Sequence, residues 1–129
     1  MTFTQAIASG FQNYVTFRGR APRSEYWYWV LFVLLVSIAA GILDAALFPL
    51  VEVSPLVSVA GLLFLLPGLA VSIRRLHDLD RSGWWYLILF IPLIGWVVLI
   101  IWACMRGTVG ANRFGPDPLA GIVPVERTV

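Results

Sequence analysis

The chain has 129 residues, of which 60% are hydrophobic and 12% are charged, and its mean hydropathy is +0.86. Soluble domains carry about 25% charged residues, and a chain of this length cannot hide so much apolar surface from water. The composition therefore predicts a single domain in a lipid bilayer. A net charge of only +2, without a long basic tract, excludes a nucleic-acid-binding protein, and one cysteine, Cys104, excludes an internal disulfide and a cysteine-based zinc site.

The first 17 residues carry no charge, and they lack the positive start of a signal peptide. Phe3, Ile7, Phe11 and Tyr14 recur at helical spacing with polar residues between them. This pattern predicts a short amphipathic helix that lies at the membrane surface. Packing of the same apolar stripe against the rest of the domain is an equally simple explanation.

A charged boundary follows, with Arg18, Arg20 and Arg23 inside six residues. Pro22 suits the first turn of a helix, and Glu25 in that turn complements the helix dipole. The aromatic residues directly after it form an interfacial belt, in which we expect Trp27 and Trp29 to act as membrane anchors.

The first predicted span covers about residues 27–48, which make about 33 Å of helix and can cross a bilayer. Asp44 is its one acid and lies near the far interface, so we expect a partly hydrated residue at the helix end rather than a proton carrier. The second span covers about residues 56–73, where Pro67-Gly68 predicts a kink whose freed backbone groups need partners.

The third span is expected over about residues 84–105, opening with the anchors Trp84 and Trp85. The sequence IPLIG at residues 91–95 indicates a kink near its middle. A re-entrant hairpin that turns there is an alternative, but each arm would have about 8–10 residues against the roughly 20 needed to cross. We therefore favour a single kinked helix, followed by a turn-rich segment and a flexible tail at residues 119–129.

Charge is densest between the second and third spans, at residues 74–85. In a helix Arg74, His77, Asp78 and Arg81 share one face, so Asp78 would reach both arginines. Asp80 or Ser82 would cap the helix that begins at Trp84. One interpretation is a solvated loop with weak local ion pairs; the other is a cluster at headgroup depth that binds lipid phosphate or a partner.

Three crossings with the N-terminus inside would put six arginines on the inner face: Arg18, Arg20, Arg23, Arg74, Arg75 and Arg81. The carboxyl-terminal tail would lie outside with the other three, Arg106, Arg113 and Arg127. This bias favours a cytoplasmic N-terminus. It also brings the two charged stretches to one face, where Glu25 is the natural partner of Arg74 or Arg75.

The segments that carry these features resemble the DUF805 family of small bacterial inner-membrane proteins. The matching stretches are FRGRAPRSEYW at 17–27, LPGLAVSIRRLHD at 66–78, RSGWW at 81–85, IPLIG at 91–95 and GTVGANRFGPDP at 107–118. The resemblance covers about residues 10–118, and we expect residues 1–118 to form one membrane domain. It implies a helical integral membrane protein of the plasma membrane and leaves its activity undefined.

Signals for catalysis are weak. His77 beside Asp78 supplies a base and an orienting group, with Ser82 or Ser72 as a nucleophile, but no nucleophile elbow or oxyanion motif accompanies them. One histidine among carboxylates lacks any recognised metal-ligand spacing, and the glycines do not form a phosphate-binding loop. We expect no enzyme, no metal and no cofactor.

The favoured interpretation is a membrane scaffold or interaction protein whose arginine-rich face binds anionic headgroups or a protein partner. The candidate residues are Arg18, Arg20, Arg23, Glu25, Arg74, Arg75, His77, Asp78 and Arg81. A subunit of an oligomeric transporter or channel is the alternative, although Ser37, Asp44, Ser58 and Ser72 give a sparse polar lining. A membrane enzyme that acts on lipid at His77 is the third hypothesis.

Overall fold

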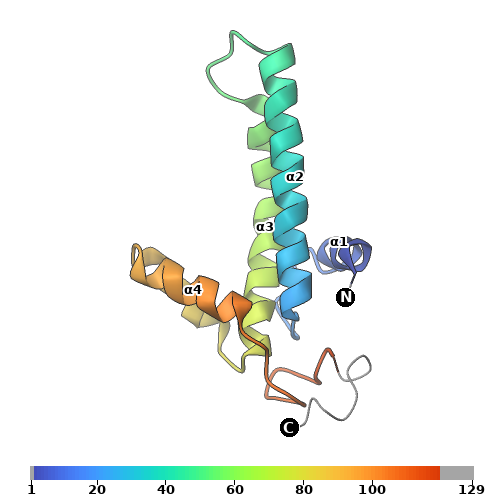
Figure 1. Cartoon of the computed structure of the whole chain (residues 1–129), viewed down its shortest axis with the longest axis vertical. Helices are drawn as coiled ribbons and strands as arrows, with labels where there is room; N and C mark the ends of the chain where they lie inside the picture. The colour runs from blue at the N-terminus through green and yellow to red at the C-terminus, as the bar shows by residue number, and fades with distance from the viewer. Residues whose placement is uncertain (1, 120–129) are drawn as a thin grey trace.

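The computed structural model describes residues 2–119, so the tail expected at 119–129 lies almost wholly outside the described residues. Its helices are α1 (Phe3–Gln12), α2 (Arg23–Leu47), α3 (Pro55–Asp78), the 3₁₀ helix η1 (Gly83–Phe90) and α4 (Ile94–Cys104). Figure 1 shows α2 and α3 side by side as a long antiparallel pair, with α1 on one side and η1 and α4 on the other. The predicted all-α architecture is confirmed.

Both helices of the central pair are long and apolar enough to span a membrane, with 25 residues in α2 and 24 in α3. At 1.5 Å per residue each is about 36 Å long, against a hydrocarbon core of about 30 Å. The third apolar helix, α4, has only 11 residues, so the pair is the part of the described chain with spanning length.

Asp44 joins the two long helices at their far end. Its carboxylate accepts hydrogen bonds from the backbone N–H groups of Leu56 (2.9 Å) and Val57 (3.0 Å). These are among the first N–H groups of α3, which have no partner inside the helix. Asp44 does lie at a helix end, as expected, but it is 5% exposed, so it is a buried cap rather than a hydrated residue.

The backbone carbonyl that the proline in α3 frees has a hydrogen-bond partner, as the sequence requires. Pro67 has no N–H and leaves the carbonyl of Leu63 without its helical donor. The hydroxyl of Tyr14, just after α1, donates to that carbonyl. The amino-terminal segment is thereby attached to the middle of α3.

Helix α1 packs with one face on α2, which is the second of the two explanations for its apolar stripe. Gly10 lies so close to Trp29 that a Cβ there would be 2.2 Å from the indole ring, and Phe11 meets the same ring edge to face. Trp29 is 2% exposed and forms the core with Ala21 and Val71. Its prediction as an interfacial anchor is therefore wrong.

The single kinked helix expected at residues 84–105 is also wrong. The chain forms a helical hairpin there, because Leu93 turns with a φ of 64° directly after Pro92. Gly95 lets the two arms approach, since a Cβ at this position would be 1.7 Å from the carbonyl oxygen of Ile88. Each arm is about 16 Å long, too short to cross a bilayer.

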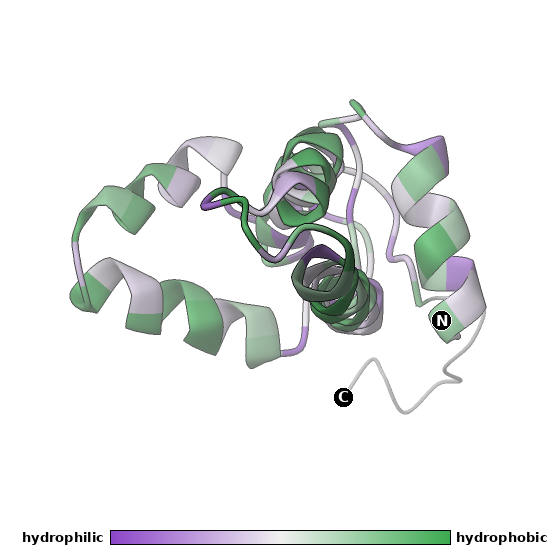
Figure 2. Cartoon of the chain, turned by 90° about the horizontal axis from the view of Figure 1, so that it is seen from above, coloured by the Kyte–Doolittle hydropathy of each residue, from purple (hydrophilic) through white to green (hydrophobic). Residues whose placement is uncertain are grey.

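The hairpin leaves the central pair sideways and returns to the end from which it started (Figure 1). Seen from above, its arms are mostly apolar along their length (Figure 2), and its tip is exposed, with Phe90 79% and Leu93 70% accessible. The segment after α4 consequently lies beside the start of α2 and the end of α3. This position differs from the expected arrangement, in which three crossings put the segment at the opposite end from the N-terminus.

Candidate functional site: a buried arginine cluster

The end of the helix pair where α2 begins and α3 ends, called the arginine end below, contains a buried arginine cluster made of Arg20, Glu25, Arg74, Arg75 and Asp78. All five side chains are 5% exposed or less. Buried charges are costly unless they are paired and hydrogen-bonded. The contacts within the cluster offset this cost in part, while Nε and Nη2 of Arg74 and Nε of Arg75 are buried without a hydrogen-bond partner among the described residues.

Asp78 is the central carboxylate. Its Oδ1 accepts from Nε of Arg20 at 3.0 Å, and its Oδ2 accepts from Nη1 of Arg75 at 2.7 Å. The expectation that Asp78 would pair with Arg74 and Arg81 is wrong, because the side chain points toward the segments before α2 and after α4. Gly107 allows this approach, since a Cβ there would be 1.9 Å from Oδ2 of Asp78.

Arg20 joins Asp78 to the segment after α4. Its Nη1 donates to the carbonyl of Gly110 at 2.7 Å, and its Nη2 donates to the carbonyl of Thr108 at 2.5 Å. The N–H of Thr108 in turn donates to the backbone carbonyl of Asp78 at 2.7 Å. One guanidinium thus holds residues 107–110 against the end of α3.

Arg75 and two side chains from α2 donate hydrogen bonds to the backbone carbonyls at the end of α4. Nη2 of Arg75 donates to the carbonyl of residue 102 at 3.3 Å and also to that of Met105. Nε1 of Trp27 and Nη1 of Arg23 donate to the carbonyls of residues 103 and 104 at 2.9 and 3.2 Å. The last carbonyls of a helix lack internal donors and carry partial negative charge, so these donors fix the hairpin to the central pair.

The expected pairing of Glu25 with Arg74 is confirmed. Nη1 of Arg74 lies 2.6 Å from Oε2 of Glu25, and both side chains are buried. The backbone carbonyl of Arg74 also accepts from the N–H of Ala21 at 2.9 Å. The two charged stretches of the sequence therefore meet at one end of the structure, as predicted.

His77 and Asp78 do not form a catalytic pair. Nδ1 of His77 lies 3.0 Å from the carbonyl oxygen of Gly19, so this nitrogen carries the proton and donates it. The ring stacks on Phe114 with centroids 4.0 Å apart, while both oxygens of Asp78 face arginines. Among the described residues, no group of three histidine, cysteine or acidic side chains is placed to hold a metal.

The other arginines are more accessible. Arg18, Arg23, Arg106 and Arg113 are exposed, and Arg81 is half-buried with its guanidinium 4.3 Å above the ring of Trp102. Arg113 pairs with Asp80 at 3.3 Å on the surface. Ser82 caps η1 by accepting from the N–H of residue 84 at 3.3 Å, as expected.

Three of the four predicted anchors are at least partly accessible: Trp27 is 38%, Trp84 79% and Trp85 48% exposed. Sequence reasoning missed the stretch 107–118 as part of the site. Its glycines were a signal for this role: Gly107 allows the close approach of Asp78, and Gly110 and Gly115 adopt the positive φ of tight turns.

Two apolar helices of spanning length, an apolar hairpin and a buried arginine cluster at one end define an α-helical membrane protein. The chain belongs to the DUF805 family, which is described as protein of unknown function and matches residues 14–116. Three of the segments that carry this resemblance, at residues 17–27, 66–78 and 107–118, are joined by the contacts of the arginine cluster.

Relatives point to the same class. Inner membrane protein YhaH of Escherichia coli K12 is 48% identical over 109 residues, which cover 83% of this chain and 90% of the relative. Inner membrane protein YhaI of the same strain is 47% identical over 118 residues, which cover 91% of this chain and 98% of the relative. No solved structure matches the chain.

Proposed function

We propose that the chain is a two-span protein of the bacterial inner membrane with its arginine end in the cytoplasm, and that it acts as a scaffold by binding anionic headgroups there. The observation that carries this proposal is the charge distribution. All eight arginines in residues 2–119 belong to the arginine end, while the opposite end has Asp44 and Glu52. Cytoplasmic segments near spans are enriched in arginine and lysine, which supports this orientation.

The arginines divide into two groups with different tasks. Arg20, Arg74 and Arg75 are buried with carboxylates and carbonyls, so they hold the fold together and are not available to headgroups. Arg18 and Arg106 are exposed, and neither has an ion pair among the described residues. We assign headgroup binding to this exposed group, which keeps Arg18 from the residues suggested by the sequence and adds Arg106, which three crossings would have placed on the outer face.

The expected strength follows from the surface potential of anionic membranes. An arginine near such a surface contributes about 1 kcal/mol, or about a fivefold change in binding. Exposed arginines without an internal carboxylate keep this full contribution. Arg113 keeps less of it, because Asp80 already neutralises its charge.

The test is native mass spectrometry of the protein released from nanodiscs that contain equal amounts of phosphatidylglycerol and phosphatidylcholine. The wild type should retain phosphatidylglycerol selectively, and Arg18→Gln and Arg106→Gln should each reduce this selectivity about fivefold. Glu52→Gln is the matched control at the opposite end and should change nothing. Equal retention of the two lipids by the wild type would refute the proposal, and retention of a second protein instead would replace lipid by a protein partner.

A further inference from the structure

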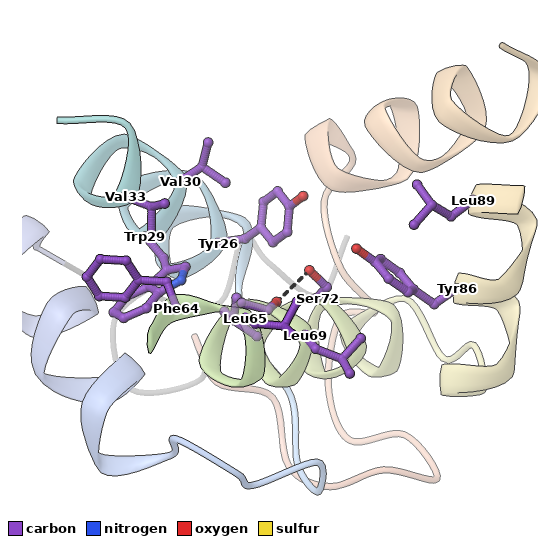
Figure 3. A pocket seen from close by; sticks show the side chains of 12 residues that line it. Tyr26, Trp29, Val30, Val33, Phe64, Leu65, Leu69, Ser72, Tyr86 and Leu89 are labelled. Carbon is purple, nitrogen blue, oxygen red and sulfur yellow. Dashed lines mark hydrogen bonds between the residues drawn. The ribbon is translucent and has the colours of Figure 1, made fainter. Parts of the chain in front are cut away.

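A cavity of about 410 Å³ lies between α2, α3 and η1. Its volume is within the range of about 300–1,000 Å³ found for small-molecule sites. Figure 3 shows its apolar walls, which include Val30, Val33, Phe64, Leu65, Leu69 and Leu89. The cavity, called the groove below, is distinct from the arginine cluster and takes no part in its contacts.

The groove has a polar end and an apolar end. Tyr26, Ser72 and Tyr86 line it nearest the arginine cluster, and a smaller adjoining hollow shares these three residues and reaches Arg75. Ser72 donates its hydroxyl proton to the carbonyl of Gly68 at 2.8 Å, as drawn in Figure 3. The remainder of the lining is hydrocarbon, so water would find few partners there.

The groove opens to the surroundings of the helix pair. Three of its apolar lining residues are also accessible from outside: Val30 is 37%, Leu65 63% and Leu89 38% exposed. Around apolar spanning helices the surroundings are lipid tails. An empty apolar space would leave its walls without dispersion contacts on one side, whereas an acyl chain from the bilayer restores them.

An exposed cation, Arg23, lies one helical turn before the polar end of the groove on α2. Arg23 precedes Tyr26 by three residues, so the two share one face of α2 with the lining residues Val30 and Val33. Arg23 is exposed, forms no ion pair among residues 2–119, and has the carbonyl of Cys104 as its described acceptor. Its remaining N–H groups suit a phosphate.

We propose that the groove holds one acyl chain of an anionic phospholipid, whose phosphate lies at Arg23. This inference rests on the proposed headgroup binding and adds a specific site to it. The lining residues of α2 lie in its first half, and those of α3 lie across its middle, with Tyr26 and Ser72 nearest the arginine end. The lipid therefore comes from the leaflet at the arginine end and directs its tail toward the bilayer centre.

Gly68 offers a direct way to fill the groove. It lines the groove, and a Cβ at this position meets no atom within 4 Å, so Gly68→Leu should project into the space that the acyl chain needs without a clash. Gly61→Leu is the matched control, because Gly61 lies in the same helix, also has free space, and does not line the groove. Both substitutions favour the helix by a similar amount, since leucine replaces glycine.

The measurement is native mass spectrometry in the phosphatidylglycerol nanodiscs described above, with photolabelling by phosphatidylglycerol that carries a diazirine in its acyl chain. The wild type and Gly61→Leu should keep one tightly held lipid and be labelled within residues 26–33, 64–72 or 86–89. Gly68→Leu should lose that lipid and at least about 90% of the label, a tenfold weakening.

The outcomes separate this inference from the proposed function. If Gly68→Leu keeps the lipid and the label, the groove is not the site, while selective retention of phosphatidylglycerol still supports headgroup binding. If the wild type retains no anionic lipid selectively, both proposals fail. Equal loss in Gly61→Leu would show a general effect on α3 and overturn the groove.

Discussion

Asp78 should be the most costly single carboxylate to neutralise in this chain. Asp78→Asn leaves Arg20 and Arg75 buried, with side chains 1% and 3% exposed, and removes the one charge that both contact. Breaking a buried ion pair by removing one partner costs about 3–5 kcal/mol. Asparagine keeps one oxygen acceptor, so we expect a loss of about 3 kcal/mol in the free energy of unfolding.

Asp80→Asn is the matched control two residues away. Asp80 also pairs with an arginine, Arg113, at 3.3 Å, but the two side chains are 48% and 59% exposed. Exposed pairs contribute between about 0 and 1 kcal/mol. The same chemical change should therefore cost at least about 2 kcal/mol less at this position.

The assay is equilibrium unfolding in mixed micelles with increasing dodecyl sulfate, followed by tryptophan fluorescence and circular dichroism. Limited proteolysis should also cut the Asp78→Asn variant faster within residues 106–118. Arg20 binds this segment, and Asp78 is the residue that positions Arg20. If both variants unfold at the same detergent fraction as the wild type, the arginine cluster does not stabilise the fold as its geometry indicates.

Two further substitutions test single contacts in the same unfolding assay. Gly107→Ala should destabilise the chain by about 1–3 kcal/mol, because its Cβ would lie 1.9 Å from Oδ2 of Asp78. Gly61→Ala is the control, and because Gly61 has free space around it, this variant should be neutral or slightly stabilising. Equal effects of the two substitutions would contradict the close approach of Gly107 to Asp78. Asp44→Ala should cost about 1 kcal/mol through loss of the α3 cap and speed hydrogen exchange at the amides of residues 56 and 57; unchanged exchange at these amides would mean that the cap is not formed.

The long helices were predictable because charge and apolar runs alternate clearly along the chain. Arginines and glycine mark the start of α2, and charge marks the end of α3. The Glu25–Arg74 pair followed from this, since an antiparallel pair brings the start of one helix beside the end of the next. These features depend on composition over 20 residues or more, which a sequence displays directly.

The hairpin was not predictable to the same degree. Proline and glycine at residues 92 and 95 indicate a kink and a turn equally well, and both arms are apolar in either arrangement. The deciding facts are the positive φ of Leu93 and the contact of Gly95 with the carbonyl of Ile88. Both belong to the folded chain and have no separate signal in the sequence.

The sequence also failed to predict the partners of Asp78 and the burial of Trp29, for a related reason. Helical spacing makes Arg74, Arg75 and Arg81 all near neighbours of Asp78 and does not choose Arg75 among them. It also cannot find Arg20, which is 58 residues away. Four consecutive aromatic residues occupy all sides of a helix, so a belt at 26–29 necessarily sends one ring inward. Which ring is buried depends on where α1 docks, and Gly10 decides this by making room for Trp29.

We infer that the hairpin returns the chain to the arginine end, so that α1 and residues 105–118 share one side of the membrane. Single cysteines at exposed positions test it directly in a Cys104→Ser background, with Thr4→Cys, Glu52→Cys and Val109→Cys labelled by a membrane-impermeant maleimide in intact cells and in inverted vesicles. Positions 4 and 109 should react in inverted vesicles, and position 52 should react in intact cells. Reaction of position 109 on the same side as position 52 would show that residues 83–104 cross the bilayer and that the hairpin does not return to the arginine end.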